Sequence, residues 1–205
     1  MKGKFIVVEG LEGAGKSSVI RLIRETLAAH DIQSISTREP GGTPMAESIR
    51  DCVKHNWEEE VAVETELLLM YAARLQLLNN TIKPTLEKNV WVVGDRHDLS
   101  TQAYQGGGRG VSEDVLASLR KMTLKDFSPD LIIYMDVEPE VGLKRARGRG
   151  ELDRIEQAGM EFFKRTRQRY LELTADNPAI VRVDANQEMS WVHNKVKNVL
   201  LRYLN

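Results

Sequence analysis

The sequence predicts an α/β fold of three layers, in which a five-stranded parallel sheet is flanked by helices. Short β-branched runs alternate with longer helical patterns, which is typical of parallel strands joined by helices. Several of these runs are apolar along almost their whole length, which indicates strands buried on both faces. No repeat, low-complexity tract or proline-rich linker divides the 205 residues, so we expect a single domain over 1–205.

Each element follows from its local pattern of apolar residues. The predicted strands are residues 5–9, 34–37, 90–94, 131–136 and 180–183. Apolar residues recur at i, i+3 and i+4 in the predicted helices, which are residues 16–29, 64–79, 112–125, 138–147, 156–174 and 189–204. Glycines among polar residues make 105–110 and 148–153 the expected flexible loops.

The overall charge excludes some classes of partner. The 29 Lys and Arg residues nearly balance the 30 Asp and Glu residues, and the net charge of -1 argues against a protein that binds nucleic acid or an anionic membrane surface. No stretch approaches the length of a membrane span, and the apolar run at the N-terminus is too short for a signal peptide. The single cysteine, Cys52, suits a reducing compartment, so we expect a cytoplasmic protein.

The loop after the first predicted strand carries the clearest chemical signal. Residues 10–17 read GLEGAGKS, which matches the P-loop pattern G-x-x-x-x-G-K-[ST] between a strand and a helix. Glycines let backbone N–H groups converge on phosphate oxygens, and the following helix adds its positive end. Lys16 is expected to reach the β and γ phosphates, and Ser17 to join the shell of Mg²⁺. The sequence therefore predicts a P-loop NTPase fold, unless the glycines form an incidental turn.

Two further features bear on the type of reaction. A guanine-specific switch needs an Asn/Thr-Lys-x-Asp element and a D-x-x-G turn, and neither occurs, since residues 194–197 read NKVK and lack the acid. Glu12 places a carboxylate inside a loop built for polyanions, which is unfavourable unless it faces a hydroxyl or an arginine. The alternative is that Glu12 points to solvent.

Charged residues also follow the third predicted strand, at the edge of the sheet where α/β proteins bind ligands. Asp95 is expected to contact Mg²⁺ through water, and Arg96 to donate to a second phosphate. A surface salt bridge between neighbouring charges is the alternative. Nothing in the sequence requires His97 as a base.

Six motifs follow one another along the chain: EGLEGAGKS at 9–17, TREPGGT at 37–43, AAR at 72–74, DRH at 95–97, AYQGGGRG at 103–110 and RGRGELDR at 147–154. Together they resemble the bacterial thymidylate kinases, which phosphorylate dTMP with ATP and Mg²⁺. The resemblance runs over nearly the whole chain. The P-loop is generic, whereas REPGGT followed by DRH and AYQGGGRG is close to diagnostic.

The resemblance implies how the base and sugar of dTMP are read. Arg74 would donate to thymine O4, and Gln105 would pair with the edge of the base, which rejects bases whose polar groups would be left unpaired. Tyr104 would crowd the 2′ position and so favour deoxyribose. Glu12 would meet the 3′-hydroxyl, which accounts for an acid in the P-loop.

The resemblance also implies the phosphate contacts: Arg38 and Arg96 would hold the acceptor phosphate, with Glu39 and Asp95 organising them and the metal. The expected dTMP contacts are Glu12, Arg38, Glu39, Pro40, Met70, Tyr71, Arg74, Arg96, Thr101, Tyr104 and Gln105. The expected ATP contacts are Gly10, Leu11, Glu12, Gly13, Ala14, Gly15, Lys16, Ser17, Ser18, Arg145 and Arg154. The expected catalytic residues are Lys16, Arg149, Arg96, Asp95 and Glu12, and the expected Mg²⁺ contacts are Ser17 and Asp95.

One position departs from the family pattern. Many members carry Phe four residues before the base-reading arginine, where the ring stacks on thymine, but this chain has Met70 there, followed by Tyr71. Either Met70 covers the base with its polarizable thioether, or Tyr71 supplies an aromatic face. Both residues could instead belong to the core of the helix.

Cations gather around glycines in residues 143–154, where we expect a mobile lid at about 143–156. Family members with an acid in the P-loop place the catalytic arginine in the lid, which favours Arg149 here, with Arg154 second. Residues 184–186 resemble the segment beside the adenine, where Arg145 could stack. The alternative is a solvated charge face at the end of a helix.

The expected reaction transfers the γ-phosphoryl group of MgATP to dTMP and yields dTDP and ADP, for dTTP synthesis. Mg²⁺ is the expected cofactor, ATP and dTMP are the expected partners, and the family implies a homodimer. Two other functions stay open from the residues alone: a nucleoside monophosphate kinase for another base, and a P-loop module that binds nucleotide without turnover.

Overall fold

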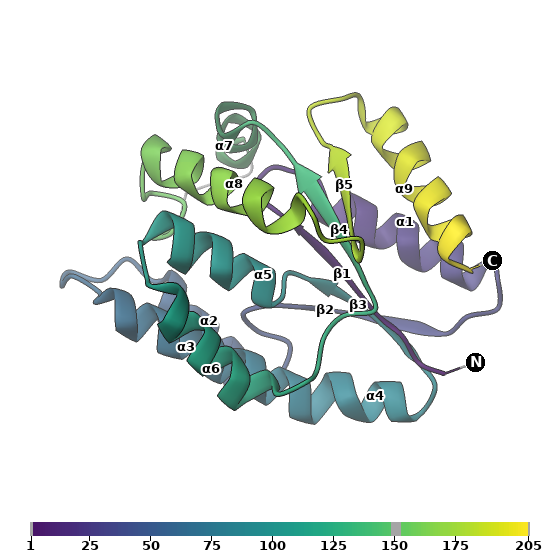
Figure 1. Cartoon of the computed structure of the whole chain (residues 1–205), viewed down its shortest axis with the longest axis horizontal. Coiled ribbons are helices and arrows are strands. Elements are labelled where there is room, and N and C mark those ends of the chain that lie inside the picture. The colour runs from purple at the N-terminus through teal and green to yellow at the C-terminus, as the bar shows by residue number, and fades with distance from the viewer. Residues whose placement is uncertain (1, 149–152, 205) are drawn as a thin grey trace.

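The computed structural model describes residues 2–148 and 153–204 and has a five-stranded parallel sheet at its centre (Figure 1). The strands are β1 (Phe5–Gly10), β2 (Ser34–Arg38), β3 (Trp91–Asp95), β4 (Leu131–Asp136) and β5 (Ile180–Asp184), in the spatial order β2-β3-β1-β4-β5. Each neighbouring pair is parallel. The α/β class and the P-loop arrangement are therefore confirmed. Each strand begins and ends within about one residue of the predicted position.

Helices connect the strands and cover both faces of the sheet. The predicted helices are found as α1 (Lys16–Ala28), α3 (Val63–Leu77), α6 (Glu113–Leu124), α7 (Pro139–Arg147), α8 (Met160–Thr174) and α9 (Met189–Leu204). The prediction missed α2 (Pro44–Lys54), α4 (Lys83–Glu87), α5 (Asp98–Thr101) and the π-helical segments η1 (Leu78–Ile82) and η2 (Gln102–Gly108). The start of α2 does carry a local signal, since Thr43 Oγ1 accepts from the Ala46 N–H at 3.2 Å and Pro44 follows the cap.

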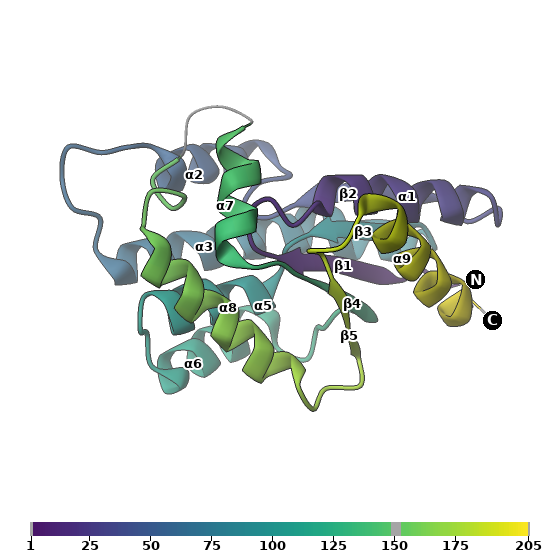
Figure 2. The same cartoon turned by 90° about the horizontal axis from the view of Figure 1, so that it is seen from above.

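The side chains of β1 point alternately to the two faces of the sheet, as a strand requires. Ile6 and Val8 pack in the cluster that includes α1 and α9, two helices that lie side by side in both views (Figures 1 and 2). Phe5 and Val7 pack on the opposite face with Leu77, at the end of α3. Burial on both faces explains why β1 reads as a continuous apolar run.

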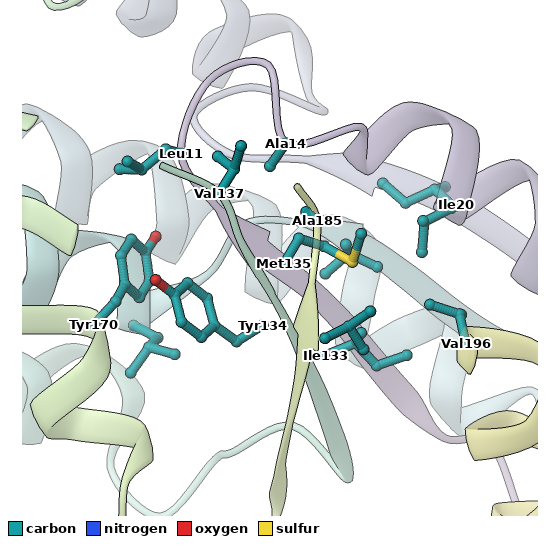
Figure 3. Packing of buried hydrophobic residues seen from close by; sticks show 14 of the residues in the cluster. Leu11, Ala14, Ile20, Ile133, Tyr134, Met135, Val137, Tyr170, Ala185 and Val196 are labelled. Carbon is teal, nitrogen blue, oxygen red and sulfur yellow. The ribbon is translucent and has the colours of Figure 1, made fainter. Parts of the chain in front are cut away.

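Figure 3 shows the same alternation in β4, where Ile133 and Met135 lie toward α1 and α9, while Tyr134 points the other way onto Tyr170 of α8. The two tyrosine rings stack with centroids 4.8 Å apart. This stacking joins α8 to the centre of the sheet.

Residues 105–110 do not form the flexible loop that was expected. Residues up to Gly108 belong to η2, and Gln105 and Gly108 are buried. A Cβ at Gly107 would lie 2.4 Å from the Cβ of Arg169, and one at Gly108 would lie 2.4 Å from the ring of Phe162. The glycines therefore allow close packing against α8 rather than motion, a distinction that composition could not reveal.

The second expected loop, at 148–153, cannot be compared, because residues 149–152 lie outside the described residues. Among the residues that the structure describes, no helix has both the length and the apolar character needed to cross a membrane.

Candidate active site

A cleft with a volume of about 390 Å³ lies at the carboxyl ends of β1, β2 and β3. It brings together most of the side chains that the sequence singled out. The predicted site residues that line it are Glu12, Gly13, Gly15, Lys16, Ser17, Ser18, Arg38, Glu39, Pro40, Met70, Arg74, Asp95, Arg96, Thr101, Tyr104 and Gln105.

The P-loop forms one end of this cleft. Gly13 and Gly15 have φ values of 71° and 87°, which lie in the left-handed region that favours glycine. Gly15 caps α1 without a side chain, so the N–H groups of the first turn are available to an anion. Lys16 Nζ donates to the carbonyls of Gly10 and Leu11, at 3.0 and 2.9 Å, which holds the ammonium within the loop.

The ammonium of Lys16 is in an unfavourable environment for a cation. Burial and the nearby charge of Arg96 lower its pKa to about 8, although Asp95 and Glu12 oppose that shift. A bound polyphosphate would add negative charge next to Lys16 and favour its protonated form.

Glu12 faces the interior of the cleft and not the solvent. Its carboxylate accepts from Arg96 Nη2 at 2.6 Å and from the Tyr104 hydroxyl at 2.6 Å. Burial alone would favour its neutral form, but the charges of Arg96 and Lys16 hold the pKa of Glu12 below its usual value. The solvent-facing alternative is therefore wrong, and the acid in the P-loop is balanced by the arginine and the hydroxyl.

Arg96 adopts a backbone conformation that is unusual for an arginine, with φ of 71°. The next N–H, that of His97, donates to Glu9 Oε1 at 2.8 Å, and Arg96 N–H donates to the carbonyl of Val8 at 3.0 Å. These bonds from β1 stabilise the turn, so that the guanidinium lies 4.8 Å above the ring of Tyr104 and reaches Glu12. The preceding residue, Asp95, lines the cleft with a buried Oδ1 that has no hydrogen-bond partner in the described part of the chain.

Arg74, on α3, is held by a buried network at the opposite end of the cleft. Its Nε donates to Glu39 Oε2 at 2.7 Å, and its Nη2 donates to Thr101 Oγ1 at 2.8 Å. Glu39 Oε1 also accepts from His97 Nδ1 at 2.7 Å. Within residues 2–148 and 153–204, the buried Arg74 Nη1 has no hydrogen-bond partner, and it lies 3.7 Å from Asp98 Oδ1 as an ion pair.

The expected roles of Arg38 and Glu39 need a correction. Glu39 was expected to organise Arg38 and Arg96, but it holds Arg74 and His97. Arg38 is half-exposed and pairs with Glu47 of α2 at 2.8 Å. The reason is that successive side chains of extended backbone point to opposite sides, so residues 38 and 39 at the end of β2 cannot share one direction.

The structure separates Met70 from Tyr71. Met70 lines the cleft, whereas Tyr71 is buried and its hydroxyl donates to Asp98 Oδ1 at 2.9 Å. The guanidinium of Arg74 lies 4.9 Å over the Tyr71 ring, so this aromatic face is already covered by a cation. Placing Tyr71 against a base is therefore wrong for this arrangement of α3.

Other predicted ATP contacts lie elsewhere in the structure. The side chains of Leu11 and Ala14 pack in the core, and Gly10 ends β1, so a ligand could meet only their backbone. Arg145 donates to the Ala185 carbonyl at 2.9 Å. Arg154 does not line the cleft but pairs with Glu66, with Nη2 and Oε2 2.8 Å apart. Arg149 lies outside the described residues.

Sequence reasoning missed several cleft residues. Arg50 and Lys54 line the cleft from α2, one turn apart on the same face. Burial and the cations Arg38 and Arg96 lower the pKa of Arg50, which shows how closely positive charge is gathered here. The capping signal at Thr43 could have revealed α2 and, with it, these two cations. The other missed residues are His97, Ser100, Asp153, Ile155 and Glu156.

Comparisons with known proteins agree with this geometry. The family model described as "Thymidylate kinase" matches residues 8–196. A thymidylate kinase of Alteromonas mediterranea is 62% identical over 204 residues, which cover 100% of this chain and 92% of that relative. A thymidylate kinase of Pseudoalteromonas translucida is 61% identical, and the match covers 98% of this chain and 96% of that relative. A thymidylate kinase of Idiomarina loihiensis is 58% identical, and the match covers 100% of both chains.

Replacing Glu39 with glutamine should destabilise the protein in a pH-dependent way. Burial works against the charged form, but His97 and Arg74 hold the pKa of Glu39 below its ordinary 4.5. The contribution of ionised Glu39 to the free energy of unfolding is therefore complete above pH 4.5, and it is lost as the pH falls through the folded-state pKa. In urea unfolding, we expect Glu39→Gln to lose about 3 kcal/mol at pH 7.

The difference from wild type should shrink as the pH is lowered toward the folded-state pKa. The exposed Glu172 provides the control, and Glu172→Gln should leave the unfolding curve unchanged at pH 7. Equal stability of Glu39→Gln and wild type at pH 7 would contradict the network described here.

Proposed function

The chain belongs to the thymidylate kinase family, and on that premise we propose that it transfers the γ-phosphoryl group of ATP to dTMP, giving dTDP and ADP. The observation that carries the proposal is that one cleft has a P-loop at one end and, at the other, buried polar side chains suited to contact a base. Lys16 belongs to the first end, and Arg74 and Gln105 belong to the second. Between them, Arg96 and Arg38 supply positive charge where an acceptor phosphate would lie.

The acceptor end suits a thymine nucleotide. Arg74 lines the cleft and, in our proposal, its guanidinium donates to a carbonyl of the base, while Met70 provides an apolar surface in the same cleft. Tyr104 is held by its bond to Glu12, so its ring restricts the space near the sugar. Glu12 lies within reach of that same region and, in our proposal, accepts from the 3′-hydroxyl.

The chemistry asks for positioning and charge neutralisation. The phosphate of dTMP is already ionised and attacks the γ-phosphorus in line, so the protein supplies no general base. Lys16 and Arg96 stabilise negative charge on the transferring group and on the acceptor. Both are held in advance by Glu12 and the P-loop carbonyls, so little reorganisation is needed during the reaction.

The residues present fit a magnesium ion that accompanies ATP. Asp95 presents a buried oxygen without a partner in the described chain, and the Ser17 hydroxyl lies in the same cleft. Mg²⁺ takes one or two protein oxygens and completes its shell with phosphates and water. When bound, it would neutralise phosphate charge, and we assign its protein contacts to Ser17 and Asp95.

We extend the proposal to a lid at about 143–156 whose Arg149 contacts the transferring phosphoryl group. The support is the position of α7 beside the P-loop, where Gly142 packs on the Glu12 carbonyl and Arg145 Nη1 donates to the Gly13 carbonyl at 3.4 Å. Closure of such a segment would exclude water and so prevent hydrolysis of ATP.

We also propose a homodimer. Exposed apolar residues follow one stripe on α3, with Leu68 and Leu75 55% and 37% exposed, and another on α6, with Val115 and Met122 45% and 67% exposed. In each stripe the two residues are seven positions apart, which places them on one face of their helix, and α3 and α6 contact each other. A second copy of the chain is the occupant that the family implies.

The activity is tested with a panel of acceptors: dTMP, dUMP, CMP, GMP and AMP, each with MgATP. We expect transfer to dTMP to be the most efficient, and Lys16→Ala to lower turnover by about a thousandfold, because a preorganised cation is lost from the phosphate site. Circular dichroism and the unfolding curve of Lys16→Ala serve as the folding control. Preference for another base would identify a different monophosphate kinase, and binding without turnover would identify a nucleotide-binding module.

The covering of the base is tested at position 70. Met70→Ala should raise the KM for dTMP about tenfold with little change in kcat, since an apolar contact of about 1–3 kcal/mol is lost. Met70→Phe should restore a low KM, because it supplies a ring at the same place. Tyr71→Phe, which removes only the bond to Asp98, should leave the KM for dTMP unchanged, and a rise with this variant alone would assign the base contact to Tyr71 instead.

The dimer is tested by sedimentation velocity. A charge placed in the stripe by Leu75→Glu should convert the dimer to monomer at micromolar concentration, because a buried unpaired carboxylate is costly. Trp191 on α9 is 45% exposed, and Trp191→Glu should leave the dimer intact as the matched control. A wild-type protein that sediments as a monomer would refute the dimer.

A further inference from the structure

Glu66 is a charged residue buried where no ligand reaches it. It lies in the first turn of α3 and is 1% exposed. Its Oε1 accepts from Gln105 Nε2 at 2.8 Å, and its two oxygens accept from Arg109 Nε and Nη2 at 3.2 and 3.0 Å. Arg154 Nη2 lies 2.8 Å from Oε2 as an ion pair that is not aligned as a hydrogen bond. One carboxylate thus joins η2 to the chain that follows residues 149–152.

These partners keep Glu66 ionised. Burial favours the neutral acid, but the hydrogen bonds from Arg109 and Gln105 hold the pKa of Glu66 below its usual value. An ionised carboxylate accepts hydrogen bonds and cannot donate them. Gln105 must therefore turn its Nε2 toward Glu66, so the charge decides an amide orientation that the shape of the side chain leaves open.

The Oε1 atom of Gln105 is then left for a ligand. Gln105 lines the cleft, and none of the described residues donates to its Oε1. This oxygen is not fully buried, so it keeps some accessible surface. The guanidinium of Arg74 lines the same cleft and supplies the donor beside this acceptor.

This pair of groups distinguishes two pyrimidines. Thymine presents an N3–H donor beside the O4 acceptor, which matches an acceptor from Gln105 and a donor from Arg74. Cytosine presents an N3 acceptor beside an N4–H₂ donor, which places like groups opposite each other. Buried polar groups that face like partners remain unpaired and cost affinity.

We propose that Glu66 is a positioning residue that sets base specificity: by fixing the Gln105 amide, it directs an oxygen acceptor toward the base and favours thymine over cytosine. This inference rests on the proposed function, because it takes dTMP as the acceptor. Glu66 itself does not line the cleft within the described residues and acts only through Gln105.

The test compares kcat/KM for dTMP and dCMP in wild type and in Glu66→Gln. The variant keeps the size of the side chain, but its amide both donates and accepts, so Gln105 is free to turn around. We expect the KM for dTMP to rise about tenfold with little change in kcat, and the dTMP-to-dCMP ratio to fall at least as much. The control is Glu172→Gln, which removes an exposed carboxylate on α8 outside the cleft and should keep the ratio of wild type.

A double-mutant cycle separates positioning from a general loss of structure. Gln105→Ala should lower the ratio as Glu66→Gln does, and Glu66→Gln should add nothing in the Gln105→Ala background. An unchanged ratio in Glu66→Gln, equal shifts in both backgrounds, or a wild-type ratio in Gln105→Ala would each overturn the inference. The last measurement does not require Glu66→Gln to fold. A wild-type protein without activity on dTMP would instead refute the proposed function.

Discussion

The ion pair between Glu12 and Arg96 is the interaction on which the arrangement of the cleft depends. It joins the P-loop after β1 to the end of β3, with Arg96 Nη2 and Glu12 Oε1 2.6 Å apart. The left-handed backbone of Arg96 costs about 1 kcal/mol, and the bond from His97 N–H to Glu9 offsets that cost. The guanidinium is therefore held where the two strands end, which is where phosphate charge would gather.

The same physical solution recurs at the acceptor end. The buried carboxylate of Glu39 accepts a hydrogen bond from Arg74, and the buried carboxylate of Glu66 accepts one from Gln105. Each bond fixes the orientation of the side chain that donates it. In both pairs the carboxylate and the donor come from different elements. A polar side chain held in this way needs little reorganisation when a ligand arrives, which favours both affinity and catalysis.

Several cations in the cleft lie close enough to repel one another, although acids line the cleft as well and the whole chain has a net charge of -1. Lys16, Arg38, Arg50 and Arg96 all line the cleft. Their mutual repulsion, together with burial, is visible in the lowered pKa of Lys16 and of Arg50. A bound polyanion would relieve this repulsion, which supports the proposed phosphate site in this cleft.

The sequence by itself determined the sheet, the phosphate-binding loop and the family, because strands and motifs depend on residues that are close in the chain. It predicted most of the cleft residues, but it missed α2 and the buried partners of Tyr71 and Arg154. Only the tertiary structure decided the pairs, since Glu39 and Arg74 are 35 residues apart, and Glu66 and Gln105 are 39 apart. Which donor meets which carboxylate depends on how distant elements meet and on the side to which each side chain points, and no local pattern records either.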